Sequence, residues 1–446
     1  MYNEKTVAHT VSACVWRANR EKRQNEARKG PERMCESMLD HSKRAPGAAK
    51  TLFSMRSVYY TFWAANFITH QYMAMFLREF SFTDDFTVGL IMSASSLVTT
   101  IAQLFWGRVA DHAKTKNRIL LTTIIGMIGA ILLMISPNHT GFTTLTACVL
   151  FLRFFDSVPG MLVDTIVVEN VESTGTPFGK VRVFASAGAA TGALSLFLVS
   201  LWMDLHPSTA FMVGVICCVI SFLPAALLPS TKGHAYGAKK GEKDNTSVFL
   251  LLKNRRMVLL LCYLLLMFTG VQICNLYLGV YFATDAGMNA GLGTYGLFFA
   301  FCIGVETATM SLGNRWWQTI NIYHIFTIVS IAAFFRPFIV YMAPNVYFMY
   351  FLAISQALLF APLWTRMTPY VQSIVPMELR ASSQAACSIM IAGVAPMIGA
   401  ALGGAIAETF GMRNMFGVAS CILAVVGVLF FFLFRRQRAW ESTLDD

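Results

Sequence analysis

Apolar residues recur in long blocks along this chain, separated by short polar stretches. Each block holds about 20 residues, the length that an α-helix needs to cross a hydrocarbon core about 30 Å thick. The pattern therefore predicts one transmembrane helix per block. The twelve blocks cover residues 54–77, 86–106, 119–136, 142–168, 182–202, 209–229, 257–282, 293–312, 319–341, 345–371, 382–406 and 414–434.

The predicted helices form two groups of six, separated by a polar stretch rich in lysine and arginine. The tail before the first group mixes basic and acidic residues with few large apolar ones, which is typical of disorder. The expected organisation is a basic, disordered cytoplasmic tail over 1–51, a six-helix bundle over 52–229, a cytoplasmic linker over 230–256, a second six-helix bundle over 257–434 and a cytoplasmic tail over 435–446.

Composition excludes a soluble enzyme. Hydrophobic residues make up 56% of the chain and charged residues only 13%, where soluble domains average about 25% charged. Eight of the ten cysteines fall inside apolar blocks, so no disulfide framework is expected. The histidines are scattered singly, and we expect no metal and no cofactor.

The formal net charge of +11 follows from membrane topology. If both termini are cytoplasmic, 30 of the 35 lysines and arginines fall on the cytoplasmic side, and only Arg78 and Arg413 fall outside. Cytoplasmic loops of membrane proteins carry this excess of basic residues. We therefore expect a multi-pass protein of the plasma membrane with both termini in the cytoplasm, and no nucleic-acid partner.

The loop between the second and third predicted helices contains a recognisable motif. Gly107 is followed by Asp111 four residues later, and then by a basic cluster that includes Arg118. This pattern resembles the G-x-L-A-D-x-x-x-x-[KR] loop signature of the major facilitator superfamily. The glycine allows close approach of helices, and the aspartate can pair with basic groups or a helix N-terminus to close the inner gate.

Two further stretches narrow the resemblance to the branch of lactose permease-like and nucleoside:proton symporters. Residues 178–188 are similar to Y-G-x-x-R-x-x-G-S-x-G, with Phe178 in place of tyrosine and Ala185 in place of a glycine. Residues 376–384 and 411–416 are similar to P-x-x-L-R-A-x-x-Q and G-x-R-x-M-F. The resemblance implies an all-α membrane protein in which twelve transmembrane helices form two pseudo-symmetric six-helix bundles.

Residues near the expected cytoplasmic ends are candidates for gating. Glu169 and Arg182 flank the loop between the fourth and fifth helices, and we expect them to form a gate pair. The gate candidates are Gly107, Asp111, Arg118, Glu169, Arg182 and Arg380.

Ionisable residues inside predicted helices are costly, so each should face a partner or the substrate pathway. Arg153 and Asp156 share a helix face, and they either neutralise each other or bind a polar substrate. Asp164 has no basic neighbour on its own helix, which leaves proton binding or a partner on another helix.

In the second half, the resemblance gives Glu306 the position of an acid used in substrate binding or proton coupling, and Arg336 that of the arginine that follows it. Arg366 can meet Glu306, in which case Glu306 is a structural counter-ion instead. The tenth predicted helix has no histidine or carboxylate, unlike lactose permease. Proton coupling is then in doubt or moves to Glu306 and Asp164. No metal or organic cofactor is implied, and the proton is the expected coupling ion.

Uncharged polar residues complete the candidate site. Asn66 with His70, and Gln272 with Asn275, each share one helix face, and Gln356 lies in the tenth helix. Amides in these helices suit a ligand with many hydroxyls or ring heteroatoms. A single histidine such as His70 is also a common donor between helices.

The function expected from the sequence is proton symport of a sugar, oligosaccharide or nucleoside by a monomer in the lipid bilayer. An exporter of drugs or metabolites is the alternative. It is disfavoured because the fifth helix has small residues, Gly188 and Gly192, without the proline-glycine break of drug antiporters. A receptor without transport activity is the third possibility, against which the intact loop motif and the intramembrane charges argue.

Overall fold

The structure, a computed structural model, describes residues 47–80, 83–136, 141–233, 236, 253–285, 287–376 and 379–445. Helices and their connections account for these ranges, which contain no strand. Most of the predicted tail over 1–51 and most of the predicted linker over 230–256 lie outside the described residues.

Within the described residues, the first half of the chain forms eight helices and a short 3₁₀ turn. They are α2 (Ala48–Gln71), α3 (Met73–Arg78), α4 (Asp85–His112), α5 (Lys116–Met134), α6 (Phe142–Asp156), α7 (Pro159–Val171), the turn Glu172–Thr174, α8 (Phe178–Ser200) and α9 (Pro207–Ala226). The second half forms α10 (Arg255–Ala283), α11 (Leu292–Thr319), α12 (Ile322–Met342), α13 (Val346–Met349), α14 (Leu352–Ile374), α15 (Arg380–Ile389), a π-helical segment (Met390–Val394), α16 (Ala395–Phe410) and α17 (Met412–Asp445).

Eleven helical stretches in the described ranges are long and apolar enough to cross a membrane. They coincide with the second to twelfth predicted blocks. Helices α2 and α3 occupy the first block, but α2 also contains Lys50, Arg56 and His70, which lower its hydropathy. The all-helical membrane fold is confirmed, with a helix count near the predicted twelve.

The fourth predicted span is two helices rather than one. Helix α6 ends at Asp156 and α7 begins at Pro159. Proline lacks a backbone N–H and so removes one helical hydrogen bond, while Val158 before it keeps helical dihedral angles. The break separates Asp156 at the end of α6 from Asp164 in α7, within the single membrane-length stretch Phe142–Thr174.

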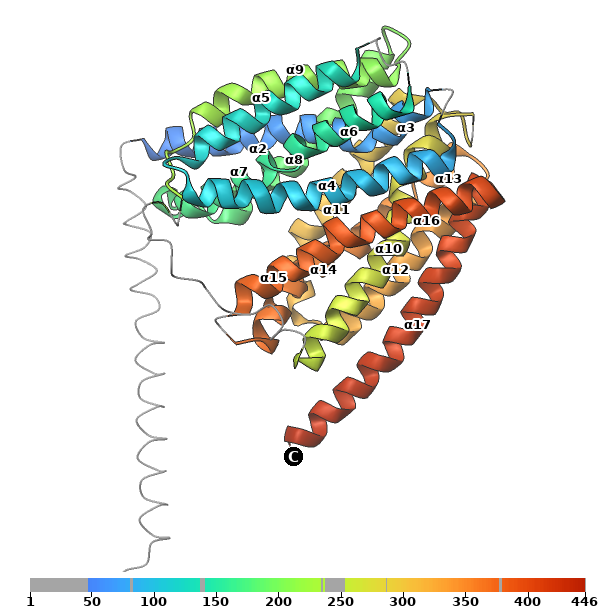
Figure 1. The fold of residues 1–446 in the computed structure, drawn as a ribbon. Coiled ribbons are helices and arrows are strands. Elements are labelled where there is room, and N and C mark those ends of the chain that lie inside the picture. Colours follow the sequence, from blue (N-terminus) through green and yellow to red (C-terminus); the bar gives the residue numbers. More distant parts are fainter. Residues whose placement is uncertain are drawn as a thin grey trace, which may run out of the picture.

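The two halves form two groups of helices (Figure 1). Helices α2 and α8 pack closely, as do α12 and α17, and contacts between the halves come mainly from α8 with α11 and from α4 with α16. We call the end with the connections 79–84, 201–206 and 284–291 the loop end. The opposite end, where α2 begins and α17 ends, is the terminal end; in Figure 1 the halves lie close together at the loop end and diverge toward the terminal end.

Tyrosines join the halves at the loop end. The Tyr72 hydroxyl donates to the Leu292 carbonyl at 3.0 Å, and the Tyr295 hydroxyl donates to Gln71 Oε1 at 3.3 Å. The Tyr277 hydroxyl lies 3.3 Å from the carbonyl oxygen of Asp85 and 3.2 Å from that of Ala400. The bonds to Leu292, Gln71 and Asp85 cross between the halves, so they stabilise the closed arrangement of this end. Ala400 belongs to the same half as Tyr277.

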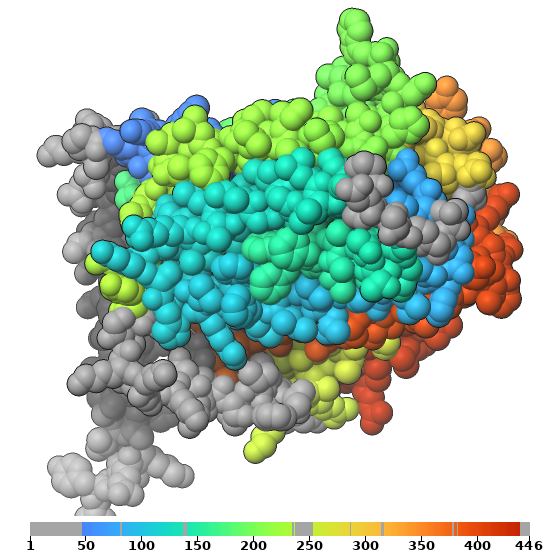
Figure 2. Space-filling view, turned by 45° about the horizontal axis from the view of Figure 1, so that its top comes forward, coloured from blue at the N-terminus to red at the C-terminus, as the bar shows by residue number. Residues whose placement is uncertain are grey.

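The outer surface of the bundle is apolar, as a lipid environment requires. Large apolar side chains are exposed along α4 and α5, Leu104 and Ile125 among them. In Figure 2 residues of the first half, coloured blue to green, cover most of the face that is turned forward.

Glycines allow α8 to approach α2 closely. A Cβ built on Gly188 would lie 2.0 Å from the carbonyl oxygen of Tyr60, and one on Gly192 would lie 2.5 Å from that of Ala64. Small residues at such crossings let membrane helices pack backbone to backbone. The predicted small-residue face of the fifth span is therefore a packing surface within the first half.

Gly188→Ala should lower the free energy of unfolding by about 1–3 kcal/mol, because the added methyl group forces α8 away from α2. Gly129→Ala in α5 is the matched control, since no atom lies within 4 Å of its Cβ position; it should be neutral or slightly stabilising. Thermal unfolding of the purified variants in one detergent tests this. Equal melting temperatures for the two variants would contradict the packing assigned to Gly188.

Candidate functional site

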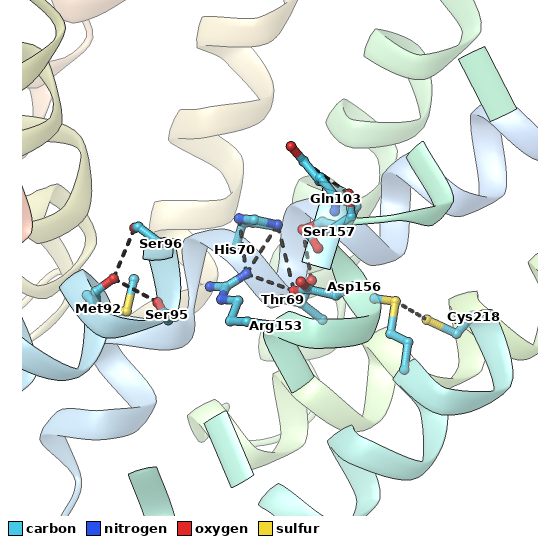
Figure 3. Close-up of polar contacts among 12 residues, drawn as sticks. Thr69, His70, Met92, Ser95, Ser96, Gln103, Arg153, Asp156, Ser157 and Cys218 are labelled. Carbon is cyan, nitrogen blue, oxygen red and sulfur yellow. Dashed lines mark hydrogen bonds and ion pairs between the residues drawn. The ribbon is translucent and has the colours of Figure 1, made fainter. Parts of the chain in front are cut away.

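Arg153 and Asp156 are buried and form a polar cluster with His70 between α6 and α2 (Figure 3). One Arg153 nitrogen, Nη1, lies 2.7 Å from Asp156 Oδ2 and 3.2 Å from each ring nitrogen of His70. Arg153 and Asp156 are only 3% and 1% exposed. The helical spacing of three therefore produces the predicted ion pair, and His70 joins it from the last turn of α2.

This cluster keeps unused hydrogen-bonding capacity. The second carboxylate oxygen of Asp156, Oδ1, and the hydroxyl of Ser157 are buried and have no hydrogen-bond partner among the described residues. Leaving such atoms unpaired costs free energy. The His70 side chain is 41% exposed, so a polar ligand can reach the cluster from its side.

A second cluster joins α7, α8 and α2. Asp164 accepts a hydrogen bond from the Tyr59 hydroxyl at 2.6 Å and lies 3.3 Å from Nε of Arg182. The Arg182 guanidinium lies over the Trp63 ring, 4.5 Å from its centroid. Both charged side chains are about two-fifths exposed. An accessible acid, a cation and an aromatic face are thus held together, an arrangement that suits hydroxyl groups on a flat ring.

The predicted gate pair of Glu169 with Arg182 is wrong in this structure. Arg182 contacts Asp164, and Glu169 instead bonds the ammonium group of Lys116, which is almost fully buried at the start of α5. Arg182 lies on the face of α8 that packs toward α2 and α7. Spacing along the chain could not reveal which face of α8 is turned toward α2 and α7.

The loop that holds the motif packs against residues 229–233. Asn117 bonds the carbonyl of Leu228 and the backbone N–H of Thr231, and the backbone N–H of Lys116 donates to the Thr231 carbonyl. A Cβ on Gly233 would lie 2.1 Å from the Asp111 carbonyl oxygen. Sequence reasoning missed Asn117 and Thr231, for which the polar loop offered no spacing signal.

The remaining gate candidates do not form a closed gate. Gly107 lies inside α4, where its Cβ position meets only the Met161 methyl group at 3.9 Å, so the expected tight approach is absent. Asp111, Arg118 and Arg380 are exposed, and no ion pair involves them within the ranges described. These charges lie in the last turn of α4, the first turn of α5 and the first turn of α15, at helix ends away from the loop end.

In the second half, Gln272, Asn275 and Arg336 form a chain of hydrogen bonds. Arg336 Nε donates to Asn275 Oδ1 at 2.7 Å, and Asn275 Nδ2 donates to Gln272 Oε1 at 3.1 Å. Arg336 is 3% exposed. The two amides predicted to share a face of α10 therefore reach an arginine of α12.

Glu306 bonds an amide rather than a cation. Gln356 Nε2 donates to Glu306 Oε2 at 2.7 Å, and the Gln356 carbonyl oxygen is buried without a partner. The alternative that Arg366 neutralises Glu306 is not realised, because no ion pair of either residue occurs in the described part of the chain. Arg366 Nε is itself buried without a hydrogen bond there.

The remaining candidate, Asn66, has a structural contact through its backbone. The Asn66 carbonyl accepts the Thr69 hydroxyl at 3.0 Å, and the Asn66 side chain is partly buried in α2. Within the described ranges no three His, Cys, Asp or Glu side chains are grouped as a metal ion would need.

Comparison with known proteins shows which family this chain matches. The MFS_1 like family matches residues 52–418. The maltose permease of Geobacillus stearothermophilus is 23% identical over 396 residues, which are 89% of this chain and 97% of that protein. An uncharacterized transporter of Bacillus subtilis (strain 168), YwbF, is 22% identical over 315 residues, 70% of this chain and 75% of that one.

Solved structures share the fold. A mutant of the nucleoside transporter NupG superposes with a TM-score of 0.75 at 15% identity, covering 86% of this chain and all of that one. A bacterial homologue of the lysosomal transporter Spinster, solved in an inward-facing and unoccupied conformation, gives a TM-score of 0.64 at 11% identity, over 88% of this chain and 98% of that one.

Asp156→Asn should lower the free energy of unfolding by about 3–5 kcal/mol, because it leaves the Arg153 charge buried without its partner. Asp164→Asn should cost only about 0–1 kcal/mol, since that pair is accessible. Thermal unfolding in one detergent compares them, and the double variant Arg153→Gln/Asp156→Asn should recover part of the loss. Equal losses for the two single variants would contradict the assigned burial.

Proposed function

The chain belongs to the MFS_1 like family of membrane transporters, and from this premise we propose that it moves a small polar organic solute by alternating access in symport with protons. The solute class is a sugar, oligosaccharide or nucleoside. The transporter works as a monomer in the plasma membrane with both termini in the cytoplasm, and it needs no metal or organic cofactor.

One observation supports a polar solute above all. Ionised and amide side chains lie within the membrane-spanning helices of both halves, and several retain buried atoms without a partner, Asp156 Oδ1 and Gln356 Oε1 among them. A ligand with many hydroxyl groups can donate to these acceptors. Such sites reject apolar analogues strongly, because an analogue leaves the polar atoms unpaired.

Asp164, Arg182 and Trp63 provide the second part of the proposed substrate site. The charged groups of Asp164 and Arg182 are accessible, and the Arg182 guanidinium lies over the indole ring of Trp63. A sugar or base ring can take a place beside that face while its hydroxyls bond the carboxylate and the guanidinium. The names of two relatives, a maltose permease and a nucleoside transporter, agree with both ring types.

Proton coupling is assigned to Glu306. Asp156 and Asp164 are paired with arginines, so protonating either leaves an unpaired cation behind. Glu306 pairs with the neutral Gln356 amide, and no described basic side chain forms an ion pair with it. The charge of Arg336 acts on Glu306 only from beyond ion-pair distance, so the protonation of Glu306 can change at a smaller electrostatic cost. Its bond to Gln356 can report the change to the neighbouring helix α14.

Glu306→Gln should abolish uphill accumulation of the solute while exchange down a gradient persists, because the amide keeps a hydrogen-bonding group but cannot bind a transported proton. Proteoliposomes with an imposed pH gradient are assayed for uptake of labelled maltose and uridine, with and without an uncoupler. Counterflow in the same vesicles, without a pH gradient, measures exchange.

Glu408→Gln is the matched control, since Glu408 is exposed in the last turn of α16. This variant should accumulate solute as the wild type does. Accumulation by Glu306→Gln at the wild-type level would contradict the coupling role. Failure of the wild type to take up any sugar or nucleoside, with or without the gradient, would contradict the solute class.

A further inference from the structure

An apolar groove runs between α12 and α17 on the surface of the second half. Its volume is about 470 Å³, within the range of ligand sites. From α12 it is lined by residues between Phe326 and Phe335, and from α17 by residues between Leu423 and Phe434. No residue of the polar clusters lines it.

The groove suits hydrocarbon throughout. Its two hydroxyl groups, on Thr327 and Ser330, donate to the carbonyls of Tyr323 and Phe326 in their own helix at 3.0 and 2.8 Å. The small residues Ala424 and Gly427 deepen it, and the Cβ position of Gly427 lies 3.4 Å from Ser330 Cβ. The groove therefore presents no unsatisfied polar group to an occupant.

The length of the groove matches one leaflet of a bilayer. Leu423 and Phe434 are eleven residues apart on α17, which is about 16 Å at 1.5 Å per residue. Half of a hydrocarbon core about 30 Å thick is about 15 Å. Since α17 continues past Phe434 toward the terminal end (Figure 1), the groove extends from mid-membrane toward that surface.

Positive charge continues the groove at the membrane surface. Arg435 and Arg436 each lie four residues after a lining phenylalanine, Phe431 and Phe432, and so continue the same helix face. Both arginines are exposed. His324, also exposed, lies three residues before Thr327 on the facing helix.

From this juxtaposition we propose that the α12–α17 groove binds an anionic phospholipid, with an acyl chain between the helices and the phosphate headgroup against Arg435 and Arg436. The apolar length of the groove accommodates the acyl chain. The arginines account for the selectivity for an anionic headgroup, because guanidinium groups bind phosphate through paired hydrogen bonds. A zwitterionic lipid has the same chain but lacks the net charge.

Thermal unfolding of the purified full chain, titrated with phosphatidylglycerol or with phosphatidylcholine of identical acyl chains, tests the proposal. A lipid that binds the folded state raises the melting temperature, and phosphatidylglycerol should do so at much lower concentration than phosphatidylcholine. Equal stabilisation by both lipids would overturn the proposal. A full effect of inorganic phosphate alone would also overturn it, showing an ion site without a lipid.

Two pairs of variants separate the contribution of the lipid's acyl chain from that of its headgroup. Val428→Trp fills the groove at an exposed position and should remove the phosphatidylglycerol effect. Val425→Trp, also exposed on α17 but outside the groove, should retain it. Arg435→Gln/Arg436→Gln should weaken phosphatidylglycerol binding about thirtyfold, from roughly fivefold per basic residue. Lys180→Gln/Lys232→Gln removes two other exposed charges, both in the first half, and should leave phosphatidylglycerol binding unchanged.

Retention of the full effect by Val428→Trp, or the same loss in both charge variants, would overturn the assigned site. The oligomeric state is measured in the same samples by light scattering. A dimer that dissociates in Val428→Trp would instead make a second copy of the chain the occupant of the groove.

Discussion

Ionised groups inside a hydrocarbon layer must be paired, and this constraint decides how the helices of the first half are joined. Arg153 neutralises Asp156 and contacts His70, so it links α6 to α2. Asp164 contacts Arg182 and Tyr59, which links α7 to α8 and again to α2. Helix α2 is therefore the common partner of both clusters. In the second half, Glu306 and Arg336 each bond an amide instead, Gln356 and Asn275, and the neutral partner of Glu306 is the basis of the proposed coupling.

Contact between the halves obeys a different constraint. At the loop end, tyrosine hydroxyls bond backbone carbonyls across the interface, and a Cβ on Gly89 of α4 would lie 2.6 Å from the Ala400 carbonyl oxygen of α16. At the terminal end the motif residue Asp111 is exposed. The hydrogen bonds among these contacts are directional and involve none of the buried charges, so they can be exchanged for others without unpairing the charges within each half. This is what alternating access requires of a carrier whose halves move as units.

Much of this architecture is readable from the sequence because lipid imposes a simple rule of length. The apolar blocks predicted the spans, and the spacing of Arg153 and Asp156 predicted their pairing, since both features depend on local helix geometry. The break before Pro159 was readable in principle from the proline. Partners that lie on different helices could not be predicted from the sequence. Arg182 with Asp164, Lys116 with Glu169 and Gln356 with Glu306 depend on the rotation and depth of each helix, which a single sequence does not encode locally.

The central claim is the proposed alternating access, in which the two ends of the carrier open and close in turn, and distances between spin labels test it most directly. In a variant without native cysteines, one label pair replaces Trp202 and Tyr347 near the loop end, and another replaces Lys180 and Thr319 near the terminal end, all four being exposed. On adding a transported solute at low pH, the account predicts a population in which the first distance lengthens while the second shortens. Distances that stay unchanged, or that change in the same direction at both ends, would contradict it.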